Sequence, residues 1–169
     1  MEKSKYDQLK DAIHTYGAAA FENLLRCKGL GQAIVDNLHG YIECPREMVR
    51  AVPAQGEFDP KKDYGDEAFS FSRRPVIVLE PVHFGLTLIV GNAEDSGLLW
   101  LRTNISIEVT GDTFDVFVAN QPVIRVPLQF DGHLTPVFEA VFREFIRTFE
   151  MEVMEFNDAR FKNGIGFIG

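Results

Sequence analysis

The sequence is poor in the features that would place it in a specialised class of protein. It has two cysteines, Cys27 and Cys44, and their spacing fits neither a zinc site nor a redox pair. We therefore expect two free thiols, no metal and no cofactor. No apolar run approaches the roughly 20 residues that a membrane helix needs, and the first residues lack the apolar stretch of a signal peptide. The expected location is the cytoplasm, away from membranes.

A basic stripe is also missing. The net charge is −8, and the lysines and arginines are scattered, with Arg73-Arg74 as the densest pair. A protein that binds duplex nucleic acid normally carries a basic patch or stripe. We therefore expect no duplex nucleic acid among the partners, and a diffuse acidic surface that keeps the chain soluble.

The chain does contain what a folded domain needs. Apolar residues make up 46% of it and charged residues 25%, and 169 residues suit a single domain that spans residues 1–169. Apolar residues at steps of three and four predict a helix over 5–28, capped by Ser4 and ended by Gly29, and a second helix over 31–39. The two helices would form a helical hairpin in the first 40 residues (1–40).

The middle of the chain changes character twice. Prolines, glycines and charges predict an irregular connection over 41–66, of a length that is often functional. From residue 67 the apolar period is two, which predicts an antiparallel meander sheet of five to six strands over 67–130. Its first strand candidates are 67–73 and 75–80. The predicted fold class is therefore α+β.

The C-terminal part is predicted to be one long helix. Thr135-Pro136 is a typical helix start, and a wide, Phe-rich stripe runs over 134–157. This helix should pack on the core face of the sheet. Residues 159–169 are expected to form a short, loosely held tail.

Two turns set the register of the sheet. Gly111-Asp112 has the glycine-first pattern of a two-residue type II′ hairpin loop. It pairs apolar residues with one another: Val109 with Phe114, Ile107 with Val116, and Ile105 with Val118. The next turn, near Asn120-Gln121, must contain an odd number of residues, because an even loop would turn Arg125 toward the core. Glu108, Asp115 and Arg125 then share one row on the outer face, where the arginine bridges two carboxylates.

The outer face of this sheet supplies the candidate site. It carries a Trp, a Phe and a Val with arginines nearby, and Trp, Phe and Arg are enriched at the centres of protein interfaces. The predicted partner-binding residues are Trp100, Arg102, Phe117, Val123 and Arg125. The chain would then be a non-enzymatic accessory or protein-binding module that binds a protein partner or itself, as a homo-oligomer. The alternative explanation is that the helical hairpin simply covers this face.

Two other functions stay open at this point. The 15 Phe residues favour a Phe-rich core, but some of them could instead line a cavity between the last helix and the sheet. The protein would then be a carrier or sensor of a small apolar ligand, in a helix-grip-like fold. A third hypothesis is an enzyme whose site is assembled around His83, with Glu108 as one candidate partner.

One motif in the tail is better explained without function. Residues 164–169 spell G-x-G-x-x-G, but a dinucleotide motif needs a strand before it and a helix after it. Here a helix is predicted before it. We therefore predict no dinucleotide cofactor and no catalytic residue from motifs.

Overall fold

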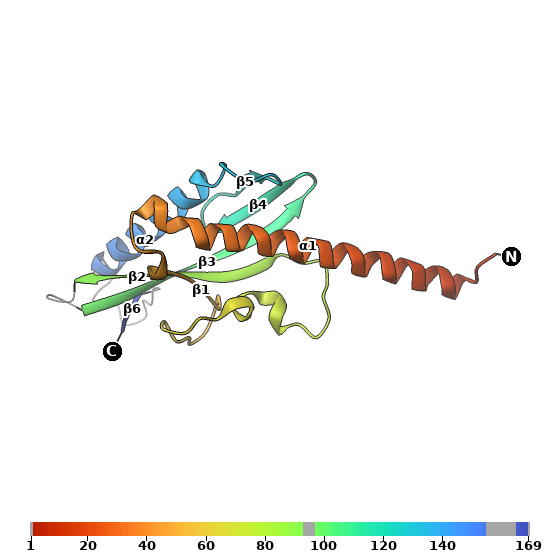
Figure 1. The fold of residues 1–169 in the computed structure, drawn as a ribbon, viewed down its shortest axis with the longest axis horizontal. Coiled ribbons are helices and arrows are strands. Elements are labelled where there is room, and N and C mark those ends of the chain that lie inside the picture. Colours follow the sequence, from red (N-terminus) through yellow and green to blue (C-terminus); the bar gives the residue numbers. More distant parts are fainter. Residues whose placement is uncertain (1, 93–96, 155–164, 169) are drawn as a thin grey trace.

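The computed structural model describes residues 2–92, 97–154 and 165–168, and it confirms the α+β class (Figure 1). Two α-helices pack on an antiparallel sheet whose strand order is β1-β2-β3-β4-β5, with β6 also paired to β3. The helices and strands are α1 Lys5–Ile42, β1 Val49–Val52, β2 Val82–Asn92, β3 Gly97–Thr110, β4 Thr113–Val118, β5 Ile124–Pro127, α2 Thr135–Met154 and β6 Ile165–Ile168. Neither α-helix, over its described residues, is long and apolar enough to cross a membrane.

The predicted helical hairpin is wrong, because α1 is one continuous helix of 38 residues. It begins as expected, with the Ser4 hydroxyl accepting a hydrogen bond from the Asp7 N–H at 3.1 Å. The helix continues through Gly29. This glycine lies on the exposed side of the helix, and no described atom lies near the position a side chain would occupy. A glycine inside a helix costs about 1 kcal/mol relative to Ala. Burial of Leu30 and Ile34, which follow the glycine, offsets that cost. The helix ends at Ile42, and the next residue, Glu43, has a φ of 64°.

The predicted register of the sheet is confirmed at both turns. Ile107 lies opposite Val116, and Val116 lies opposite Ile124, as the matching of apolar residues requires. The row of Glu108, Asp115 and Arg125 also forms, although the Arg125 Nε lies 3.8 Å from the nearest Asp115 oxygen. Because Arg125 is mostly exposed, this ion pair contributes little to stability.

The boundaries between residues 41 and 81 differ from the prediction. The connection expected over 41–66 contains strand β1, which pairs with β2, and short 3₁₀ turns at Arg46–Met48 and Gly65–Ala68. The strand candidates 67–73 and 75–80 are not strands. The first ends in a 3₁₀ turn at Ser70–Arg73, and its Ser70 side chain occupies the edge of β2 by accepting a hydrogen bond from the His83 N–H. The sheet therefore begins at residue 49.

The C-terminal helix begins at Thr135 and is described to Met154; its predicted last turn lies outside the described residues. The tail is not a loose end throughout. Ile165–Ile168 forms β6, which pairs antiparallel with β3 at Leu98–Leu101, beyond the end of β4. The first and last glycines of the G-x-G-x-x-G stretch lie outside the described residues.

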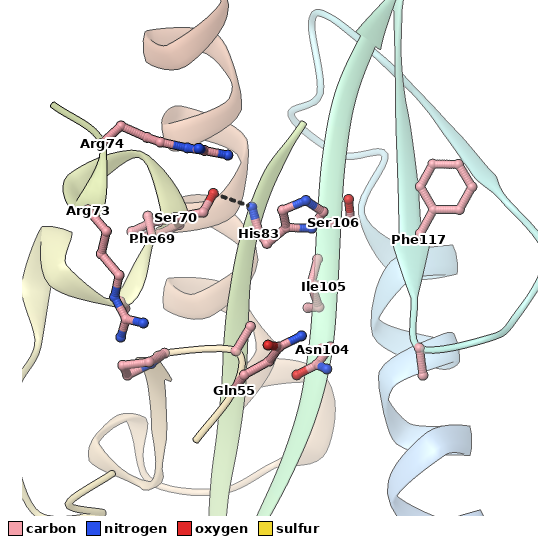
Figure 2. Close-up of a pocket in the computed structure, with 14 residues that line it drawn as sticks. Gln55, Phe69, Ser70, Arg73, Arg74, His83, Asn104, Ile105, Ser106 and Phe117 are labelled. Carbon is pink, nitrogen blue, oxygen red and sulfur yellow. Dashed lines mark hydrogen bonds between the residues drawn. The ribbon is translucent and has the colours of Figure 1, made fainter. Parts of the chain in front are cut away.

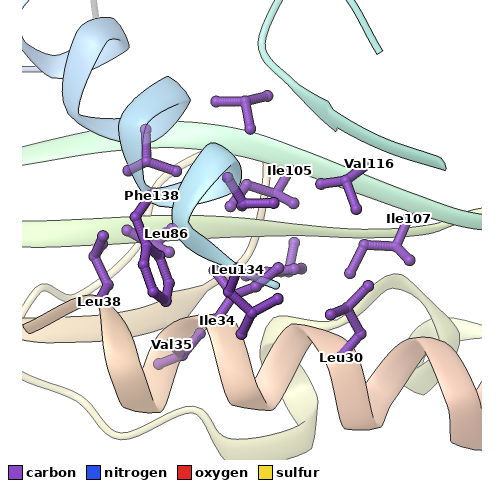
Figure 3. Close-up of a cluster of buried hydrophobic side chains, with 14 of the residues drawn as sticks. Leu30, Ile34, Val35, Leu38, Leu86, Ile105, Ile107, Val116, Leu134 and Phe138 are labelled. Atoms are coloured by element: carbon purple, nitrogen blue, oxygen red, sulfur yellow. The ribbon is translucent and has the colours of Figure 1, made fainter. Parts of the chain in front are cut away.

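The core lies on one face of the sheet, between the strands and both helices (Figure 3). Leu30, Ile34 and Leu38 of α1 meet Leu86, Ile105 and Ile107 of the sheet, Phe138 of α2, and Leu134, the residue just before α2. Most of these side chains are fully buried. Because both helices lie on this face, α1 does not cover the outer face, where the candidate site was predicted.

Candidate functional site

The five predicted partner-binding residues fall into two separate groups on the outer face. Trp100 and Arg102 lie on β3, opposite Ile89 and Thr87 of β2. Phe117 and Arg125 lie toward the other side of the sheet, on β4 and β5, and Val123 is an exposed residue just before β5. The predicted single patch is therefore interrupted.

Trp100 and Arg102 are covered by another segment of the same chain. Phe58, from the connection between β1 and β2, packs edge-on against the Trp100 ring with centroids 4.8 Å apart. The Arg102 guanidinium stacks on the Phe58 ring at 4.6 Å and donates hydrogen bonds to the carbonyl oxygens of Gly56 and Pro53, at 2.9 and 3.3 Å. Burial lowers the pKa of Arg102. These contacts attach the connection to the sheet face, so Trp100 and Arg102 have a structural role.

The attached connection creates a pocket of about 460 Å³ on the outer face (Figure 2). Its floor is the outer face of β2 and β3, with Phe117 of β4 on one side. The connection after β1 and the 3₁₀ turns Gly65–Ala68 and Ser70–Arg73 form the opposite wall. The residues around it are Pro53, Ala54, Gln55, Ala68, Phe69, Ser70, Arg73, Arg74, His83, Asn104, Ile105, Ser106, Phe117 and Ala119.

Two local features place these walls. Gly85 faces outward at the point where the chain leaves β1, and a side chain there would come within 2.8 Å of the Pro53 carbonyl oxygen. The glycine therefore allows the connection to cross the sheet closely. In the same wall, the Ser70 hydroxyl accepts a hydrogen bond from the His83 N–H at 2.9 Å, which holds the 3₁₀ turn Ser70–Arg73 against β2 (Figure 2).

The electrostatics of the pocket differ from those of the whole chain. The net charge is −8, yet the pocket is bordered by two arginines and a histidine. Arg74 is neutralised by a two-pronged ion pair with Glu80, at 2.9 and 2.7 Å. Arg73 is exposed and has no hydrogen bond or ion pair to any other described residue. Its guanidinium is therefore available to an anionic group of a ligand.

The neutral polar groups extend the same surface. Gln55, Asn104 and Ser106 offer amide and hydroxyl groups beside His83, and the Phe117 ring and Ala119 supply an apolar edge (Figure 2). Recognition sites typically combine an apolar wall with a few polar groups that fix orientation. This pocket can therefore hold a group that carries a carboxylate next to an apolar side chain.

The catalytic hypothesis around His83 gains no support from this geometry. The imidazole is exposed, and no hydrogen bond joins it to Glu108 or to any other carboxylate of the described residues. A general base normally needs such a partner to orient its ring. Among the described residues there is also no cluster of three His, Cys, Asp or Glu side chains that could hold a metal ion.

The carrier hypothesis requires space between α2 and the sheet. Phe114 and Leu101 of the sheet are at most 2% exposed and belong to one continuous core cluster with α2 residues such as Val141. Phe69 and Phe84, with ring centroids 4.9 Å apart, pack against Gly31 of α1 and fill the core on that side. The described core therefore gives no support to an internal apolar ligand.

Most of the pocket residues were not predicted, although the sequence contains signals for them. Arg73-Arg74 is the densest basic pair in the sequence, and the connection predicted over 41–66 is of a length that is often functional. Gly85 interrupts an alternating strand, which often indicates a close backbone approach. Only Phe117 belongs both to the predicted set and to the pocket.

Comparisons with protein-family models, with curated proteins and with solved structures found no match for this chain.

Proposed function

We propose that this protein is a non-catalytic binding module that recognises a short segment of a partner protein in the outer-face pocket. The observation that carries the proposal is Arg73, which pairs with no other described residue and lies at the edge of a 460 Å³ hollow, in a chain of net charge −8. The segment would present a carboxylate to Arg73 and His83. It would place a neighbouring apolar side chain against Phe117.

The surrounding structure supports this kind of ligand over a small apolar one. The pocket is open to solvent on the outer face, and the backbone that carries its polar groups belongs to strands and to an anchored connection. A site whose backbone is already in place before binding gives specificity because less of the chain must be ordered. The carboxylate would also be attracted by a locally positive surface, which raises the association rate.

The test is selection of binding peptides, followed by affinity measurements on variants. A library of random peptides displayed on phage is selected against the wild-type protein, and the enriched peptides are measured by fluorescence anisotropy. We expect enriched sequences with Asp, Glu or a C-terminal carboxylate next to an apolar residue. Arg73→Glu should then weaken binding by about tenfold or more, because charge reversal adds repulsion to a lost ion pair. Phe117→Ser should weaken it by removing the apolar wall.

The matched control is Arg147→Glu, which makes the same charge change at an exposed arginine of α2, on the other side of the sheet. It should leave peptide affinity unchanged. The proposal is wrong if no peptide is enriched, or if the enriched peptides bind Arg73→Glu and Phe117→Ser as tightly as wild type. Equal loss with Arg147→Glu would indicate a nonspecific charge effect and would also contradict it.

A further inference from the structure

The apolar stripe of α1 continues well beyond the surface that covers it. Ala20, Leu24 and Cys27 are buried against the sheet side of the molecule. On the preceding turns, the same stripe is exposed: Tyr6 at 72%, Leu9 at 62%, Ile13 at 69% and Tyr16 at 44%. Figure 1 shows this N-terminal half of α1, which we call the arm (residues 5–19), extending away from the sheet.

The arm has the sequence pattern of a helix that pairs with another helix. Its exposed apolar residues lie at 6, 9, 13 and 16, and the buried Ala20 continues the series. Alternating steps of three and four give a narrow seam, as in the a and d positions of a coiled coil. Ala12 and Ala19 flank one side of this seam and allow a close approach of a second helix.

An isolated arm would be a weak helix. Helices of about 15 residues are marginal in water without a partner. Gly17 lies in the arm with nothing packed on it, which lowers its helix propensity further. The ion pairs Lys3–Asp11 and Lys10–Asp7 are exposed and contribute little. The arm therefore needs a partner that covers its seam.

We infer that the partner is the arm of a second copy of this chain, packed antiparallel about a two-fold axis level with residue 11. In that register Tyr6 lies opposite Tyr16 of the partner subunit, and Leu9 lies opposite Ile13 of the partner subunit. Each of the four seam residues of one copy then contacts one seam residue of the other copy. This self-complementarity is what a symmetric dimer interface requires.

The lengths of the two arms fit this arrangement. The partner's helix would begin beside residue 17, one turn before Ala20 enters the core of the first copy. A parallel pair does not fit, because beyond Ala20 each seam is already covered by its own sheet. A parallel pair would also place Lys5 close to Lys10 of the partner subunit on both sides of the seam.

The base of the arm enlarges the interface. The Tyr16 hydroxyl accepts a hydrogen bond from the Leu79 N–H at 2.9 Å, so residues 75–80 run beside this turn of α1. Val76, Ile77 and Leu79 in that segment are 67%, 38% and 50% exposed. They lie at the level that Tyr6 of the partner subunit would reach. The seam offers on the order of 400 Å² per copy, and the segment brings it closer to the roughly 800 Å² per partner of a stable interface.

Sedimentation equilibrium of the full chain over a range of concentrations tests the dimer. We expect a reversible dimer in the wild type. Ile13→Asp should raise its dissociation constant about a hundredfold, because each dimer then buries two unpaired charges. Thr15→Asp is the matched control: it adds the same charge on the arm but away from the seam, and it should dimerise like wild type. A monomeric wild type, or a dimer that Ile13→Asp leaves intact, overturns the inference.

Cross-linking then tests the orientation, in a Cys44→Ser background. Ala12→Cys should form an interchain disulfide on mild oxidation, because residue 12 of each copy lies near the two-fold axis of the antiparallel pair. Tyr6→Cys should not, since ten residues at 1.5 Å separate the two positions by about 15 Å. Cross-linking through Tyr6→Cys alone would indicate a parallel pair and overturn the inference. Because these residues lie outside the outer-face pocket, either result is independent of the proposed peptide site.

Discussion

Removal of the Arg102 side chain should release the connection that forms one wall of the pocket. In Arg102→Ala, two hydrogen bonds from a charged donor to the Pro53 and Gly56 carbonyls are lost, together with the stacking on Phe58. Such hydrogen bonds contribute roughly 1.5–3 kcal/mol each, and an exposed cation–π contact about 0.5–1 kcal/mol. Because Arg102 is only half-buried and one bond is long, we expect a net loss of about 2 kcal/mol.

The effect should appear in two measurements. Urea unfolding followed by circular dichroism gives the change in the free energy of unfolding. Limited trypsin digestion gives the local effect, because Lys61 and Lys62 lie in the released connection and should be cleaved faster. Trp100 is the only tryptophan of the chain, so its emission should shift to longer wavelength as Phe58 leaves it.

Arg125→Ala provides the matched control on the same sheet face. Its side chain is 77% exposed and lies 3.8 Å from Asp115, so its removal should change stability by less than about 0.5 kcal/mol. Arg102 does not anchor the connection if Arg102→Ala unfolds like this control and the emission of Trp100 does not move. Selected peptides should also bind Arg102→Ala more weakly than Arg125→Ala, because only the first variant loses a pocket wall.

Three further predictions concern α1. Gly29→Ala should stabilise the protein by up to about 1 kcal/mol in chemical unfolding, because the helix is continuous there and no described atom is packed on the glycine. Gly31→Ala should destabilise the protein by roughly 1–3 kcal/mol, because the new methyl would lie 2.9 Å from Phe69 and 3.2 Å from Phe84. A loss of stability in Gly29→Ala would contradict the continuous helix. Burial, and secondarily the charge of Glu108, raises the pKa of Cys27 from 9.0 to about 11. As the pH rises, the unfolded state therefore loses this thiol proton at a lower pH than the folded state does. The difference in the free energy of unfolding between wild type and Cys27→Ala should be fully present below pH 9 and should fall between about pH 9 and 11. A difference that stays constant across that range would contradict this prediction.

The sheet was predictable where local patterns determine it. Gly111-Asp112 and the alternation of apolar residues fixed two strand pairings, because a slip by one residue would have turned Arg125 into the core. The continuity of α1 was not predictable in the same way. Gly29 has the local chemistry of a helix stop, and only the tertiary burial of Leu30 and Ile34 makes the longer helix favourable.

The site was less predictable than the fold. The alternation of β3 correctly placed Trp100 on the outer face, but it contains no information about which segment lies over that residue. Phe58 comes from a connection without periodicity, and its position depends on Gly85 and Arg102 together. A pocket assembled from a loop and two strands leaves only isolated signals in the sequence, such as a glycine in a strand.

A second exposed apolar surface, on α2, is the main competing site for a binding partner. Phe142, Ile146 and Phe149 form an exposed apolar row on α2, near Tyr41 of α1. This row is longer and more apolar than the edge of the pocket. The hollow beside it is lined by Arg143 and Arg147 but also by Glu139 and Glu150, so its charge is balanced and attracts a carboxylate less than the surface around Arg73 does.

The most direct test of the proposed site is an NMR titration of the ¹⁵N-labelled protein with a selected carboxylate-containing peptide. We expect the largest chemical-shift changes around Arg73, His83, Asn104 and Phe117, at the outer face of the sheet. Arg73→Glu should abolish them at the same peptide concentration. Changes centred instead on the apolar row of α2, and unaffected by Arg73→Glu, would show that the peptide does not bind in the outer-face pocket.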